Sequence, residues 1–114
     1  MQQILLLTRS LDIAHSSKTQ VGNMRSCVEL LSKDPRVKAI YGVTGQDTGW
    51  AALCEVPNRE EANRLAALAE VYGQSNVEIV ALMPSERLLA GLEEAERIAP
   101  DSPQAFSASF QEQA

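Results

Sequence analysis

The sequence has few of the residues that most directly mark a function. It contains one histidine, two cysteines and one tryptophan among 114 residues, and aromatic side chains make up only 4% of it. Cys27 and Cys54 lack the C-x-x-C spacing of a zinc or redox site, so we expect two buried free thiols and no metal. No G-x-G-x-x-G or G-x-x-x-x-G-K-[ST] motif is present to cradle a phosphate, and we expect no cofactor.

Positive charge and long apolar runs are also scarce. Ten basic residues face fifteen acidic ones, giving a net charge of -5, and the basic residues are scattered along the chain. This balance repels phosphate backbones and argues against nucleic-acid binding. No stretch approaches the roughly 20 apolar residues that cross a bilayer, and Met1 to Thr8 lacks the features of a secretory signal. We therefore expect a cytoplasmic protein that does not contact membranes.

The length and the 45% apolar content suit one hydrophobic core. We expect a single domain over residues 1–99. After Pro100 the chain is rich in Ser, Gln and Ala, with Phe106 and Phe110 as its only large apolar residues. This composition predicts a flexible C-terminal tail over residues 100–114.

Four segments have the pattern of strands. Residues 4–7 form a short apolar run, residues 37–44 and 77–83 alternate with a period of two, and residues 50–56 form a largely apolar run of strand character. Gly45 and Gly49 stand between the second and third of these segments and are able to take a positive φ, which predicts a β-hairpin.

Three segments have the pattern of helices. Apolar residues recur at steps of three and four from about Ser17 to Leu31, where Ser16 or Ser17 is placed to cap the helix. Asn58 with Glu61 resembles a capping box, and the helix it starts should end at Gly73 in the left-handed region. We expect a last helix over residues 86–99, capped by Ser85.

The order βαββαβ, followed by a helix, predicts an α+β fold: a ferredoxin-like plait with a four-stranded antiparallel sheet and a C-terminal helix. The strands are apolar on both faces, as Leu5 and Leu7 behind Ile4 and Leu6 illustrate. Because two helices cover only one face, we expect the other to pair with a second copy of the chain, forming a homodimer. The alternative is a monomer in which the last helix covers the sheet.

Three segments and the last strand carry a family resemblance. They are Asp34-Pro35-Arg36-Val37, the turn Tyr41 to Asp47, Glu55-Val56-Pro57-Asn58, and the strand Val77 to Met83. The sequence resembles the dimeric α/β-barrel superfamily, and within it the GYD-type domains and the effector-binding domain of leucine-responsive (Lrp/AsnC) regulators. The resemblance implies a small-molecule-binding dimer. No helix-turn-helix precedes the first strand, so it implies the effector domain alone.

Two regions are candidate sites. The turn between the second and third strands carries Thr44, Gly45, Asp47 and Trp50, which are suited to hold a small ligand on a rigid sheet. Tyr41, on the strand before it, could point into a cavity between two sheets and hydrogen-bond a ligand. The alternative is a solvated hairpin in which Tyr41 and Trp50 serve packing. His15 lies in a long loop with a carboxylate and hydroxyls nearby, a weak candidate for proton transfer beside the simpler role of a surface residue.

Three functions follow from these features. The first is a stand-alone small-molecule-binding or regulatory dimer. The second is a cofactor-independent enzyme, of isomerase or oxygenase type, acting on a small organic substrate. The third is an adaptor that binds another protein through the last helix and through Phe106 and Phe110, which would share one side of a helical tail.

Overall fold

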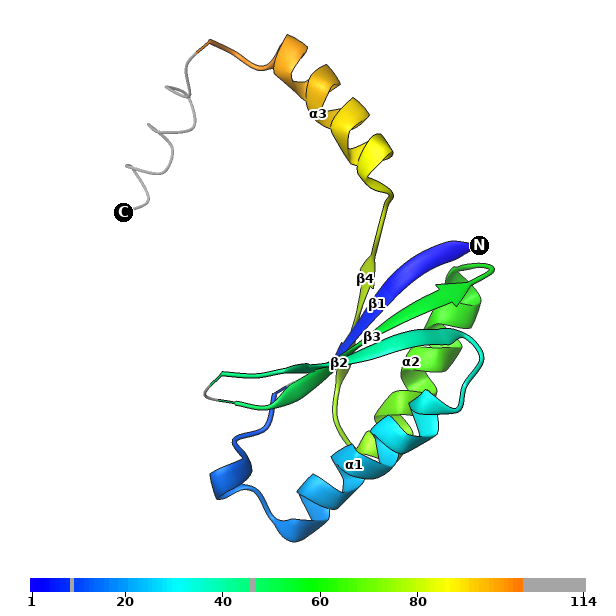
Figure 1. The fold of residues 1–114 in the computed structure, drawn as a ribbon, viewed down its shortest axis with the longest axis vertical. Coiled ribbons are helices and arrows are strands. Elements are labelled where there is room, and N and C mark those ends of the chain that lie inside the picture. The colour runs from blue at the N-terminus through cyan, green and yellow to red at the C-terminus, as the bar shows by residue number, and fades with distance from the viewer. Residues whose placement is uncertain (9, 46, 102–114) are drawn as a thin grey trace. The chain divides into compact units, whose positions relative to one another are not determined.

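The structure, a computed structural model, describes residues 1–8, 10–45 and 47–101 (Figure 1). The elements are β1 (Gln2–Thr8), the short 3-10 helix η1 (Ile13–His15), α1 (Lys18–Ser32), β2 (Val37–Val43), β3 (Gly49–Val56), α2 (Arg59–Gly73), β4 (Val77–Ala81) and α3 (Ser85–Ile98). They belong to two units, Met1–Leu82 and Met83–Ala114. The predicted α+β class, with a four-stranded antiparallel sheet and three α-helices, is confirmed.

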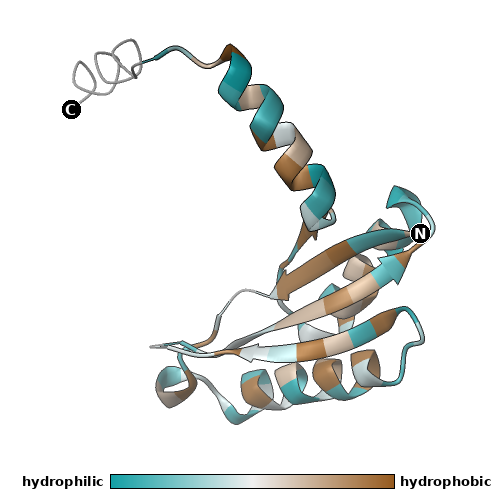
Figure 2. Ribbon diagram, turned by 45° about the horizontal axis from the view of Figure 1, so that its top comes forward, coloured by the Kyte–Doolittle hydropathy of each residue, from teal (hydrophilic) through white to brown (hydrophobic). Residues whose placement is uncertain are grey.

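The first unit is a sheet with helices on one side. Its strand order is β2-β3-β1-β4, and every neighbouring pair is antiparallel. Helices α1 and α2 lie together on one face of this sheet (Figures 1 and 2). Because side chains alternate along a strand, each strand presents one set of residues to the helices and the other set to the opposite face. We call the helix side the covered face and the other side the open face.

The hydrophobic core lies between the covered face and the two helices. Its largest fully buried side chains come from β1, β3, α1 and α2: Ile4, Leu6, Leu31, Leu65, Val56, Cys27 and Cys54. Four alanines of β3 and α2 are buried among them and let the helices approach the sheet closely. The strands on this side are therefore held by ordinary sheet-on-helix packing.

A β-bulge interrupts the expected alternation in β2. The register with β3 shifts between Val37 and Ala39. As a result Val37 and Ile40, three residues apart, both pack against the core. The strict period of two predicted for this strand is wrong at its start, because the extra residue of a bulge reverses the direction of the side chains that follow it.

The helix starts follow the local chemistry of the sequence. Ser17 caps α1 in a complete capping box: its hydroxyl accepts from the Gln20 amide at 3.1 Å, and the Gln20 side chain accepts from the Ser17 amide at 2.8 Å. Asn58 caps α2 by accepting from the Glu61 amide at 2.9 Å. Both predicted caps are confirmed, although the Glu61 carboxylate accepts from two arginine side chains rather than from the Asn58 backbone.

The predicted end of α2 at Gly73 is confirmed, but two details of the helix ends are wrong. Helix α2 ends at Gly73, yet the residue in the left-handed region is the next one, Gln74, with φ 52° and ψ 39°. No glycine in the described ranges has a positive φ, so Gly45 and Gly49 do not form the hairpin in that way. Helix α3 starts at Ser85 itself, after Pro84 in the capping position.

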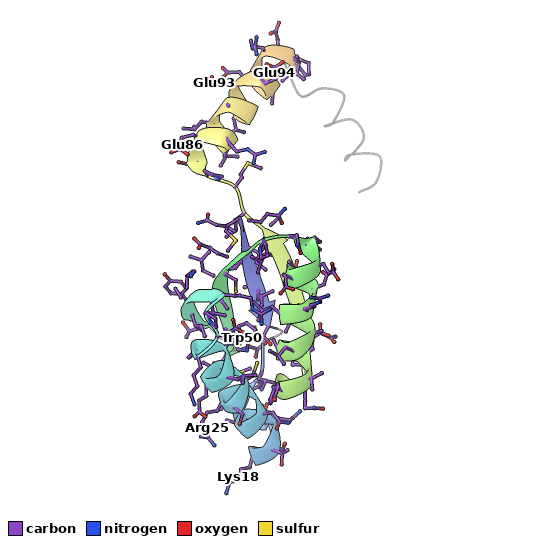
Figure 3. The ribbon with its side chains drawn as sticks, turned by 90° about the vertical axis from the view of Figure 1, so that its right-hand side faces the viewer. Lys18, Arg25, Trp50, Glu86, Glu93 and Glu94 are labelled. Atoms are coloured by element: carbon purple, nitrogen blue, oxygen red, sulfur yellow. The ribbon has the colours of Figure 1, made fainter. Side chains whose placement is uncertain are left out.

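The second unit contains α3, which has no buried residue. Leu88, Leu89 and Leu92 are exposed on it, and Glu86, Glu93 and Glu94 project from it (Figure 3). Phe106 and Phe110 lie outside the described residues. The expected division into a domain over residues 1–99 and a tail over 100–114 stays a prediction.

Candidate functional site

A cavity of about 80 Å³ opens at the end of the sheet where β1 ends and β3 begins, on the covered side. It is lined by residues from both strands, both helices and the connections between them: Thr8, Leu11, Gln20, Asn23, Met24, Cys27, Trp50, Ala69, Gly73, Gln74 and Ser75. Trp50 lies between the sheet and the two helices (Figure 3). The cavity therefore has an apolar inner wall and a rim of neutral polar side chains.

Local structure brings the first of these residues together. The Ser17–Gln20 capping box sets the start of α1, so that Gln20, Asn23 and Met24 follow on neighbouring turns of one helix. Leu11 is held by paired backbone hydrogen bonds with Thr48, each 2.7 Å long. This bridge folds the chain after β1 over the start of β3 and places Leu11 beside Trp50.

The other wall depends on a close approach of α1 and α2. A Cβ atom built on Gly73 would lie 3.3 Å from the Cys27 Cβ and 3.4 Å from its Sγ. Glycine at this point therefore lets the two helices meet. The next residue, Gln74, adopts the left-handed conformation. A non-glycine residue in that conformation costs about 1 kcal/mol. The Gln74 side chain lines the cavity and donates from Nε2 to the Val71 carbonyl at 2.7 Å.

The cavity is electrically neutral. None of the described residues that line it has an ionised side chain at neutral pH: burial raises the pKa of the Cys27 thiol, which donates to the Ala69 carbonyl at 3.4 Å. Burial also raises the pKa of Cys54 to about 11. Both thiols are free, as predicted, and raised pKa values make them poor nucleophiles.

The open face of the sheet is the second notable surface. Leu5 lies in register between Leu53 of β3 and Val80 of β4. Further out, Ala39, Tyr41 and Val43 of β2 share this face with them. Helices α1 and α2 lie on the other side, so among the described residues of Met1–Leu82 no α-helix covers this surface (Figure 2). It is an apolar centre that the first unit leaves open.

The structure separates the residues predicted to bind a ligand. Trp50 is 4% exposed and belongs to the core, whereas Tyr41 is 60% exposed on the open face. Thr44, Gly45 and Asp47 are exposed beyond the strand ends of the hairpin. These five residues therefore do not form one site, although Trp50 lines the cavity described above.

His15 lies on the surface in η1. Its Nδ1 atom is 2.6 Å from Asp12 Oδ2, and its side chain is 84% exposed. It does not line the cavity described above. A solvated pair of this kind lacks the enclosed pocket that proton transfer to a substrate needs, so no observation favours an enzyme with His15 as its base.

Sequence reasoning missed an ion-pair network at the other end of the helices. Arg36 binds Asp34 through two nitrogens at 2.7 and 3.0 Å and reaches Glu61 of α2 at 3.0 Å. The Arg36 guanidinium lowers the pKa of Asp34 by hydrogen bonding to it. Oppositely charged residues around Pro35 were the available signal. The network ties the start of β2 to the start of α2.

Nowhere in the part of the chain that the structure describes do three or more His, Cys, Asp or Glu side chains gather as a metal site. Within residues 1–8, 10–45 and 47–101, no helix has both the length and the apolar content needed to cross a membrane. No protein-family model, curated protein or solved structure matches this chain.

Proposed function

We propose that this chain is a stand-alone, small-molecule-binding or regulatory module that works as a homodimer formed through the open face of its sheet. The observation that carries the proposal is the apolar centre of that face, where Leu5, Leu53 and Val80 share one row. These three side chains are only partly buried, and a partly exposed apolar surface of this kind favours association. A two-fold axis lets identical surfaces cover each other in a closed pair.

The border of the open face is compatible with such a pair. Lys38 Nζ lies 4.0 Å from Glu55 Oε2 near one edge, and Glu78 stands on the strand at the other edge. Charges of both signs around an apolar centre avoid the like-charge repulsion that would keep two identical faces apart. Tyr41 would bring a phenol hydroxyl into the space between the paired sheets.

We propose further that the fold is a ferredoxin-like plait and that two copies pair into a dimeric α/β barrel. In its support, β3 lies between β1 and β2, β1 lies between β3 and β4, and both crossover helices lie on one face. The likeness of the Tyr41 to Asp47 turn to GYD-type and Lrp/AsnC effector domains points the same way.

Sedimentation equilibrium of the full chain and of two variants tests the pairing. Leu53→Lys places an ammonium group at the centre of the open face, and Val71→Lys places the same group on an exposed position of α2. We expect a dimer for the native chain and for Val71→Lys. For Leu53→Lys we expect the dissociation constant of the dimer to rise by about tenfold or more, since an unpaired buried charge costs well over 1.4 kcal/mol.

Native mass spectrometry of the freshly purified chain tests the binding function. We expect a dimer that carries the extra mass of a small organic molecule. A native chain that stays monomeric at every concentration would refute the pairing. As a control for folding, Leu53→Lys and Val71→Lys should both show the circular dichroism of the native chain.

A further inference from the structure

The cavity at the end of the sheet has the make-up of a site for an uncharged molecule. Its inner wall is apolar, with Met24, Trp50 and Ala69, and its polar lining residues carry only hydroxyl and carboxamide groups. A charged ligand would lose its water there without gaining a counter-charge from any residue that lines the cavity. The lining therefore selects for neutral compounds.

The size of the cavity limits the ligand further. At about 80 Å³ it is well below the roughly 300 to 1,000 Å³ of sites that enclose a drug-sized molecule. It has room for one small ring or for the end of a longer molecule, but not for a nucleotide. A flat ring suits a wall that contains an indole, because aromatic rings stack on or pack edge-to-face against one another.

The rim offers both hydrogen-bond donors and acceptors. The Oε1 atom of Gln20 accepts a hydrogen bond from the Ser17 amide, which leaves the Nε2 protons of Gln20 available as donors. The Nε2 atom of Gln74 donates to the Val71 carbonyl, which leaves Gln74 Oε1 available as an acceptor. The Asn23 carboxamide has no hydrogen-bond partner among the described residues. Carboxamides with unused donors and acceptors are matched best by another amide, which presents one of each on a single edge.

We propose that this cavity binds a small, flat, uncharged molecule that carries an amide-type donor and acceptor on one edge and an apolar ring. The ring lies against Trp50 and Met24, and the amide edge meets Asn23 and Gln74. This inference rests on the proposed binding function, whose ligand it describes, but it does not depend on the pairing of the open faces.

Benzamide is a suitable probe, with benzoate as its charged counterpart of nearly the same shape. Trp50 is the only tryptophan of the 114 residues, so its fluorescence and its indole N–H signal in NMR report on the cavity directly. With the full chain we expect a saturable change with benzamide, at a Kd in about the millimolar to high-micromolar range that so few atoms allow. Benzoate should bind at least about tenfold more weakly.

A matched pair of variants locates the site. Asn23→Leu removes the unpartnered carboxamide at similar size, and Asn63→Leu makes the same change on an exposed position of α2 that does not line the cavity. We expect Asn23→Leu to weaken benzamide binding by about fivefold to tenfold and Asn63→Leu to leave it unchanged. Thr8→Val, which removes a hydroxyl at constant shape, provides a second cavity variant if Asn23→Leu does not fold.

Three outcomes would overturn the inference. Benzoate binding as tightly as benzamide would refute the selection for neutral ligands. A complete lack of benzamide binding would refute the site. Benzamide shifts confined to Leu53 and Tyr41 would refute this location while leaving the binding function intact. Sedimentation of the same samples reports the pairing separately, so a failure of the dimer and a failure of the cavity site are distinguishable.

Discussion

The two faces of the sheet are made from similar residues and have different environments. Leu6 and Leu5 are neighbours in β1, yet Leu6 is fully buried under the helices while Leu5 is only partly buried on the open face. The same contrast holds in β3 between Ala52 and Leu53. An apolar residue in a strand therefore predicts that its side chain is covered, but it does not predict which element covers it.

Truncating one leucine on each face to alanine tests most directly whether the two faces differ in burial. We expect Leu6→Ala to lower the free energy of unfolding by about 2 to 5 kcal/mol, because it leaves a cavity in a core that cannot collapse. Leu5→Ala should cost the isolated chain less than about half as much, since less of Leu5 is buried. Urea unfolding of dilute protein measures both. Equal losses would mean that the open face is covered within one chain.

A second test concerns how closely the covering helices meet. Gly73→Ala places a Cβ against Cys27, and we expect it to destabilise the fold by about 1 to 2 kcal/mol in spite of the higher helix propensity of alanine. Gly22→Ala in α1 is the matched control, because a Cβ there meets nothing within 4 Å. It should stabilise the fold by about 0.5 to 1 kcal/mol. Thermal unfolding of both variants measures the difference in sign.

A third test concerns the ion pairs that fasten α2 to the start of β2. Arg36 lowers the pKa of Asp34 in the folded chain below its ordinary value of 3.8. The carboxylate therefore stabilises the fold above about pH 4, and this contribution is lost as the pH falls through the lowered pKa. We expect Asp34→Asn to cost about 1 to 2 kcal/mol at pH 7, because it weakens a bidentate, partly buried pair.

The pH dependence of that loss is its diagnostic feature. The difference in unfolding free energy between the native chain and Asp34→Asn should shrink steadily below pH 4, and Asp47→Asn, at an exposed position, should show no comparable change. A loss that is independent of pH would show that packing, not charge, fastens this end of α2.

The smallest expected effect is at the rim of the cavity on the covered side. Gln74→Gly relieves a left-handed conformation and should raise the free energy of unfolding by about 0.5 to 1 kcal/mol. The same change removes the Gln74 carboxamide and should weaken benzamide binding. A variant that becomes more stable and binds equally well would show that Gln74 is only a helix terminus.

Much of the fold could be predicted because its signals are local. The caps at Ser17 and Asn58 and the hairpin between β2 and β3 depend on residues within a few positions of each other. Gly73 shows the limit of such reasoning. The predicted helix end at Gly73 is confirmed, but its left-handed conformation is wrong. Gly73 instead lies against Cys27, 46 positions earlier in the chain, and no short-range pattern reveals that contact.

The candidate cavity could be predicted only in part. Trp50 stood out as the single tryptophan, and the structure does place it in the cavity wall. Tyr41, which we expect to face the space between two sheets, lies on the open face, and strand alternation sends Tyr41 and Trp50 to opposite faces. Gln20, Asn23 and Gln74 gave no signal, because neutral carboxamides are ordinary surface residues until packing gathers them around one space.

The edge strands of the sheet determine whether further copies of the chain can add to it strand by strand. The outer strand β2 is bent by its bulge and carries Lys38, and the other outer strand, β4, is only five residues long and carries Glu78. Bulges, charges and shortness are the features by which proteins keep sheet edges from adding further strands. Growth by strand addition, the route to fibrils, is therefore discouraged at both edges of the sheet.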